Sequence, residues 1–140
     1  MSIQMSATEL PTRPRIVIPA SEHARLLALA DAAEKRTPVV AEFLADELTR
    51  AEVVKDEEFD ANVVRMGSSV TYVDEVTGRT RTVTLVYPDA ADIDQNRISI
   101  LTPICAALIG LSPGQSITWP LPDGRVGSLK VLAVSYEAVE

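Results

Sequence analysis

The hydrophobic periodicity of this chain changes once, near residue 60, and that change limits the folds it can adopt. Before it, apolar residues recur three or four positions apart, the spacing of helices that bury one face. After it, short segments rich in Val, Ile, Thr and Tyr alternate with turn residues, as in β-strands. The sequence therefore predicts an α+β fold, with a helical part followed by a small sheet.

Four regions follow from this pattern. Residues 1–14 contain polar residues and two prolines and are expected to be a flexible tail. Residues 15–54 are expected to form a helical hairpin, and the charged residues 55–63 a linker. Residues 64–140 are expected to form the β-rich C-terminal domain.

The helical hairpin is predicted from local start signals. After the extended segment Arg15–Ile18, Ser21 is the expected N-cap of the first helix, which should end near Lys35. Thr37 is the expected N-cap of the second, with Pro38 at its first position. A connection this short makes the two helices antiparallel, as a short coiled coil. Its apolar seam is expected to contain Leu26, Leu29, Phe43, Leu44 and Leu48.

The C-terminal domain is predicted as a small antiparallel sheet with one short helix. Turn residues at 74–78 separate the strands expected at Val64–Asp74 and Thr80–Tyr87. A third strand is expected at Asn96–Leu101, followed by a helix that Thr102 caps and Gly110 ends. A second hairpin is expected around Pro122-Asp123-Gly124, between strands at 116–121 and 126–136.

Composition excludes several classes of protein. The formal net charge is −7 and both halves of the chain are acidic, so direct nucleic-acid binding is disfavoured. No apolar run approaches the ~20 residues of a membrane span. Residues 1–11 lack the apolar core of a secretory signal. With one cysteine, these features favour a cytoplasmic protein without internal disulfides.

No catalytic or metal-binding set is evident. His23 is the one histidine, and its helical position predicts an exposed side chain without an orienting partner. Asp89, Asp92 and Asp94 share a loop but lack the spacing of a calcium loop, so a solvated loop is expected. Cys105 lies in an apolar run and is expected in the core. The sequence predicts no metal, no cofactor and no enzyme active site.

The C-terminal half resembles the C-terminal domain of the Gre transcription elongation factors. The resemblance rests on an ordered series that covers about residues 64–137: Ala91-Asp92-Ile93, Arg97 to Ile104, Ala107-Leu108-Ile109-Gly110 and Pro113-Gly114-Gln115. It implies an FKBP-like domain. It also implies binding to bacterial RNA polymerase near the secondary channel, with Asp92, Ser99, Leu101, Thr102 and Pro103 at the β′ rim helices.

The N-terminal half is similar to the short-hairpin Rnk branch of this family, whose members are named regulators of nucleoside diphosphate kinase. Arg15–Ile18 and Ala45–Ala51 carry this resemblance, and Val83–Pro88 in the C-terminal half also recurs in this branch. Gre factors have a long coiled coil whose acidic tip helps to hold magnesium in the polymerase active site. Here the tip reads Glu34-Lys35-Arg36, one carboxylate beside two cations, which is unsuited to binding magnesium.

The resemblance therefore implies a monomeric, non-enzymatic polymerase regulator. Two alternatives stay open. One is a transcript-cleavage factor with a shortened coiled coil. The other is an FKBP-like prolyl isomerase, which the scarcity of aromatic residues disfavours.

Overall fold

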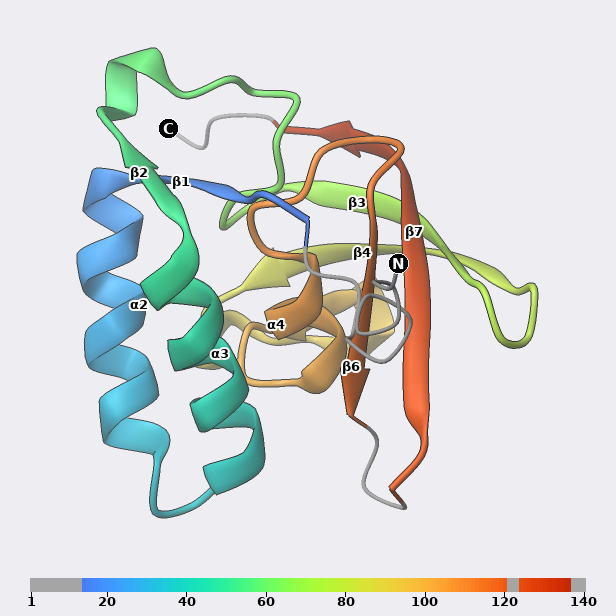
Figure 1. Ribbon diagram of the computed structural model, residues 1–140, viewed down its shortest axis with the longest axis horizontal. Coiled ribbons are helices and arrows are strands. Elements are labelled where there is room, and N and C mark those ends of the chain that lie inside the picture. Colours follow the sequence, from blue (N-terminus) through green and yellow to red (C-terminus); the bar gives the residue numbers. More distant parts are fainter. Residues whose placement is uncertain (1–13, 121–123, 137–140) are drawn as a thin grey trace, which may run out of the picture.

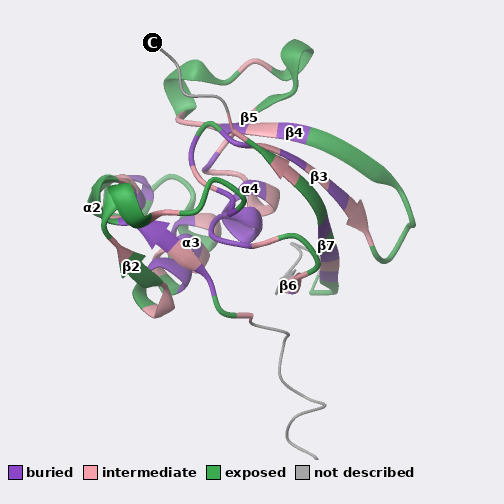
Figure 2. Cartoon of the chain, turned by 90° about the horizontal axis from the view of Figure 1, so that it is seen from above, coloured by how far each residue is buried: buried purple, intermediate pink, exposed green. Residues whose placement is uncertain are grey.

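The computed structural model describes residues 14–120 and 124–136, without the side chains of Trp119 and Pro120. Two helices lie side by side, and a curved sheet stands beside them with a short helix between (Figures 1 and 2). Nearly all of the tail expected at residues 1–14, and the turn around Pro122 and Asp123, fall outside the described residues. No helix in the described part is long and apolar enough to cross a membrane.

The helical part contains α2 (Ala20–Ala33) and α3 (Pro38–Arg50), joined by a short turn. The predicted helix starts are confirmed within a residue or two, but neither predicted side-chain cap forms. Thr37 Oγ1 donates back to the Ala33 carbonyl, 3.3 Å away. Ser21 lies inside the first turn of α2, and its backbone N–H and hydroxyl both donate to the Asp56 carboxylate. The cap of α2 is therefore an acidic residue from the segment that follows α3.

The apolar seam is confirmed for its central residues. Leu26, Leu44 and Leu48 are fully buried, whereas Leu29 and Phe43 are half-buried at the margin of the core. The hairpin prediction failed at its base. Residues 52–54 do not continue the second helix; β2 (Glu52–Val54) pairs in parallel with β1 (Val17–Pro19). Ala51, with extended backbone, ends α3 and starts this strand.

The main sheet has the strand order β5-β4-β3-β7-β6. Its strands are β3 (Ser69–Asp74), β4 (Thr80–Val86), β5 (Arg97–Ser99), β6 (Ser116–Pro120) and β7 (Val126–Ser135). The two predicted hairpins, β3–β4 and β6–β7, are antiparallel as expected. The expected all-antiparallel sheet was wrong, because β5 runs parallel to β4 and the sheet is mixed.

The parallel pairing arises from the connection between β4 and β5. After β4 the chain makes two 3₁₀ turns, η2 (Pro88–Ala90) and η3 (Ile93–Gln95), and Asn96 takes a left-handed conformation with φ of 59°. Asn and Asp tolerate this conformation better than most residues. The loop returns the chain to the side of the second half of β4, so Leu85 pairs with Ile98 in parallel register.

The core lies where α4 (Pro103–Leu108) packs between the helices and the sheet, in contact with α3 and β6 (Figure 2). Cys105, Ala106, Ala107 and Leu108 are all fully buried. Cys105 is thus in the core, as predicted, and burial raises the pKa of its thiol to about 12. A thiol with this pKa is protonated and unreactive at neutral pH.

Candidate functional site

The candidate segment Ser99–Pro103 joins the end of β5 to α4 and is held by its own hydrogen bonds. The Ser99 hydroxyl accepts from the Leu101 N–H at 3.0 Å, and the Thr102 hydroxyl donates to the Ser99 carbonyl at 2.8 Å. Thr102 Oγ1 also accepts from the Cys105 N–H at 3.4 Å, which confirms it as the N-cap of α4. These bonds fix the backbone without help from solvent, so the segment presents one defined surface.

Strand alternation along this segment would place Ile98 and Ile100 in the core and Ser99 and Leu101 outward, and this expectation was partly wrong. Ile100 is fully buried, as expected, but Ile98, Ser99 and Leu101 are all half-buried. Strand β5 ends at Ser99, so the rule that side chains alternate between two faces does not extend to Leu101. Leu101 packs at the margin of the core rather than standing free on the surface.

Asp92 is tied to the start of β5. Its backbone N–H donates to the Arg97 carbonyl and its carbonyl accepts from the Arg97 N–H, both at 2.9 Å. The Asp92 carboxylate accepts from the Gln95 side chain at 2.8 Å. Asp92 is thus bonded to Arg97, the first residue of β5, which lies two residues before the Ser99–Pro103 segment. In the described ranges, no three His, Cys, Asp or Glu side chains gather closely enough to hold a metal ion.

The three tip residues do not share one surface. Glu34, Lys35 and Arg36 are all exposed. Glu34 lines a pocket of about 260 Å³ between the helices, together with Asp31 and Glu42. Arg36 lines a different groove of about 490 Å³, together with Leu101. The structure therefore brings one tip residue, Arg36, next to the candidate segment and leaves Glu34 on another face.

Sequence reasoning missed the residues that complete this groove. Arg25 and Leu29 of α2 line one side, and Tyr87 and Asp89 line the other. The Arg25 guanidinium stacks over the Tyr87 ring, 3.8 Å from its centroid. Burial raises the pKa of the Tyr87 hydroxyl, although Arg25 lowers it, so Tyr87 stays neutral at physiological pH. The available signal was the i, i+4 spacing of Arg25 and Leu29, which places both on one side of α2.

His23 is not the isolated surface residue that its spacing predicted. It is half-buried, and its Nε2 lies 2.8 Å from the Leu48 carbonyl oxygen on α3. The bond joins the two helices near their base. It gives His23 a structural role and leaves it without a catalytic partner in the described part of the chain.

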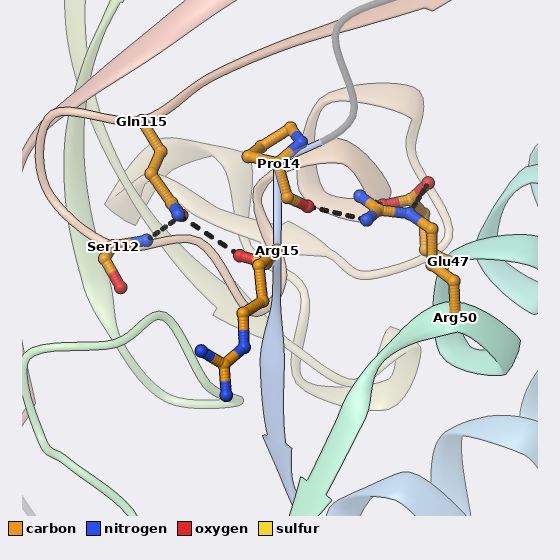
Figure 3. Close-up of polar contacts among 6 residues, drawn as sticks. All are labelled: Pro14, Arg15, Glu47, Arg50, Ser112 and Gln115. Carbon is orange, nitrogen blue, oxygen red and sulfur yellow. Dashed lines mark hydrogen bonds and ion pairs between the residues drawn. The ribbon is translucent and has the colours of Figure 1, made fainter.

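Pro14 and Arg15, the first residues that the structure describes, join the helical part to the C-terminal domain (Figure 3). The Arg50 side chain, held by Glu47, donates to the Pro14 carbonyl at 2.6 Å. Gln115 donates to the Arg15 carbonyl at 3.2 Å and accepts from the Ser112 N–H at 2.9 Å. Together with the β1–β2 pair, these bonds set how the helices stand relative to the candidate segment.

Comparison with known proteins assigns both parts of the chain. Residues 59–136 match the family described as transcription elongation factor GreA/GreB, C-terminal, and residues 14–54 match the Rnk N-terminus. The "Regulator of nucleoside diphosphate kinase" of Escherichia coli K12 is 35% identical over 126 residues, covering 90% of this chain and 93% of that protein.

Two further relatives carry the elongation-factor name. Transcription elongation factor GreA of Beijerinckia indica is 34% identical over 84% of this chain and 73% of its own length. The solved structure of a GreA/GreB factor from Nitrosomonas europaea is 38% identical, with a TM-score of 0.68 over 89% of this chain and 100% of that one. This chain therefore belongs to the GreA/GreB transcription elongation factor family, as an Rnk-type homologue.

Proposed function

We propose that this protein binds bacterial RNA polymerase and regulates transcription without cleaving the transcript. The observation that carries the proposal is the rigid, half-exposed segment Ser99–Pro103 within a domain of the GreA/GreB family. Relatives named transcription elongation factors act on the transcribing enzyme, so polymerase is the expected partner.

The contact is proposed to centre on Leu101, Thr102 and Pro103, with Ser99 and Asp92 beside them. All five side chains are partly accessible, which leaves polar and apolar atoms available to a partner. The local hydrogen bonds hold them in place before binding, and such preorganisation reduces the entropy lost on association. The proposed partner surface is the β′ rim helices near the secondary channel, and the protein is proposed to act as a cytoplasmic monomer.

The helical pair supports a non-catalytic mode of action. We regard it as a shortened counterpart of the family's coiled coil, beside a domain of FKBP-like type. At its tip, Glu34 is followed by two exposed cations, and Arg36 belongs to another surface. Magnesium binding in catalysis needs carboxylate oxygens that converge on the ion without competing positive charge. The tip does not provide this.

Binding is tested with purified core polymerase by co-migration in size-exclusion chromatography. Leu101→Asp should weaken binding about tenfold or more, as expected for a central apolar contact. The matched control is Leu132→Asp, on a leucine of β7 that is 47% exposed. Because Leu101 is half-buried, the neutral variant Leu101→Gln is tested beside it. Unchanged binding by folded Leu101 variants would reject the proposed contact.

Cleavage is tested separately in a stalled elongation complex. We expect no shortened transcript from this protein. Strong cleavage that Glu34→Ala abolishes and Glu58→Ala does not would instead favour the alternative, a cleavage factor with a shortened coiled coil. Glu58 serves as the control because it is an exposed carboxylate outside the tip.

A further inference from the structure

The groove between α2 and the Tyr87–Asp89 segment shares Leu101 with the proposed polymerase contact but is otherwise lined by residues outside Ser99–Pro103. Its floor is apolar or small, with Leu29, Ala32 and Leu101, and its volume is about 490 Å³. On α2, Leu29 and Ala33 line the groove at the margin of the core, whereas Arg25, Ala28 and Ala32 are exposed. This side of α2 is therefore open along the length of the groove.

Two cations mark the two ends of this groove. Arg25 lies in the second turn of α2 and Arg36 follows its last turn. Arg25 stacks on Tyr87, and neither guanidinium pairs with a carboxylate within the described residues. By contrast, Arg15, Arg50 and Arg65 each form an ion pair. In a chain of net charge −7, the two open cations make this groove locally attractive to anions.

The shape of the groove favours an extended peptide over a nucleotide. Arg25 already covers a face of the Tyr87 ring, so that face is closed to a nucleobase. From Arg25 to the end of α2 at Ala33 the helix rises about 12 Å, at ~1.5 Å per residue. Four residues of extended chain span about 13 Å, at ~3.3 Å each. A short strand-like segment therefore matches the length of α2 between Arg25 and the turn that carries Arg36.

We infer that this groove binds a short acidic peptide segment of a partner protein, in which a small apolar residue lies midway between two carboxylates on one face of an extended chain. The carboxylates pair with Arg25 and Arg36, and the small residue between them lies over Leu29 and Ala32. Asp89, the one carboxylate among the lining residues, is on the wall opposite α2. It repels the acidic groups of the peptide from that wall and so favours their placement along α2.

The probe is a fluorescein-labelled peptide, Glu-Ile-Ala-Leu-Glu, titrated against the full chain and followed by fluorescence anisotropy. The comparison peptide is Lys-Ile-Ala-Leu-Lys. We expect binding of the acidic peptide that weakens with added salt, and at least about tenfold weaker binding of the basic peptide. Equal binding of the two peptides, or no binding of the acidic one at low salt, would overturn the inference.

Three variants locate the binding. Arg25→Glu combined with Arg36→Glu should weaken it about tenfold, because repulsion between like charges replaces both ion pairs with the peptide. The control with the same charge change, Arg79→Glu with Lys130→Glu, uses exposed cations outside the groove and should weaken it less than threefold. Ala32→Leu fills the floor without changing charge and should also weaken binding.

Equal losses in the arginine pair and in its control would show a nonspecific charge effect and overturn the inference. The inference is also overturned if the Ala32→Leu variant has an unchanged circular dichroism spectrum and binds the acidic peptide as tightly as the parent chain. Leu101 is left intact in all of these variants. Failure of this test is therefore distinguishable from failure of the proposed polymerase contact.

Discussion

Gly110 lies so close to Ile16 that a Cβ atom at position 110 would stand 2.7 Å from the Ile16 Cβ. Gly110 also has φ of +82°, and its carbonyl accepts from the Val17 N–H at 3.2 Å. Ile16 is fully buried and cannot move aside easily. The glycine after α4 is thus the point where the first strand meets the C-terminal domain.

Gly110→Ala should destabilise the protein by about 2–5 kcal/mol. The left-handed backbone costs ~1–2 kcal/mol for a residue with a Cβ, and crowding a packed core adds ~1–3 kcal/mol. The measurement is urea unfolding followed by circular dichroism. Gly114→Ala is the matched control, because Gly114 also has φ of +90° but no atom within 4 Å of the added Cβ. Equal losses in the two variants would show that the contact with Ile16 has no energetic cost.

Arg50→Met should destabilise the protein by about 1.5–3 kcal/mol, the range for hydrogen bonds to charged groups. Glu47 is fully buried, and the Arg50 guanidinium donates to both of its carboxylate oxygens, at 2.7 and 3.1 Å. The variant also removes the bond to the Pro14 carbonyl. Urea unfolding provides the free energy.

The comparison for Arg50 is the surface pair between Arg15 and Glu52, whose side chains are 75% and 44% exposed. Glu52→Gln should cost less than about 1 kcal/mol, because solvent screens an exposed ion pair. Equal losses of stability in Glu52→Gln and Arg50→Met would show that burial of Glu47 does not strengthen its ion pair with Arg50.

Asp56→Asn should lower the melting temperature at neutral pH and lose this effect in acid. Hydrogen bonds from Ser21, first from its side chain and then from its backbone, hold the pKa of the Asp56 carboxyl below its usual value of 3.8. A depressed pKa contributes stability above the unfolded-state value, and this is lost as pH falls through the folded-state pKa. The two melting curves should therefore converge at acid pH. A constant difference down to the most acidic pH would contradict the helix-capping role of the carboxylate.

Cys105 should resist thiol reagents in the native protein. Its side chain is fully buried, and its pKa of about 12 leaves almost no thiolate at neutral pH. Modification by a chromogenic disulfide reagent should proceed only in denaturant. Rapid reaction in the native state, at the rate of a free thiol, would show that α4 opens readily.

Local signals in the sequence were sufficient for the elements whose contacts are local. Thr102 caps α4 as expected, and Asp74 and Gly78 form the turn between β3 and β4, where Gly78 has φ of +80°. These features depend on residues within a few positions of one another. Side-chain chemistry alone therefore identifies them.

Contacts between distant residues were the ones that sequence reasoning missed. The cap of α2 comes from Asp56, the partner of His23 is the Leu48 carbonyl, and β5 pairs in parallel with β4. Nothing near Ser21 or His23 in the sequence identifies these partners. The groove beside Leu101 was missed for the same reason, since Arg25 and Tyr87 are brought together only by the packing of α2 on the sheet.

The parallel pair of β1 and β2 holds both ends of the helical pair at one place, with Val17 opposite Glu52. The turn at residues 34–37 lies at the far end of the two arms (Figure 1). Helical turns inserted at that turn would leave the base of the arms in place but would carry Arg36 away from the groove that it lines with Leu101. In this architecture longer arms therefore reach further at the cost of one wall of that groove, so a protein of this plan cannot extend its tip and also keep Arg36 beside Leu101.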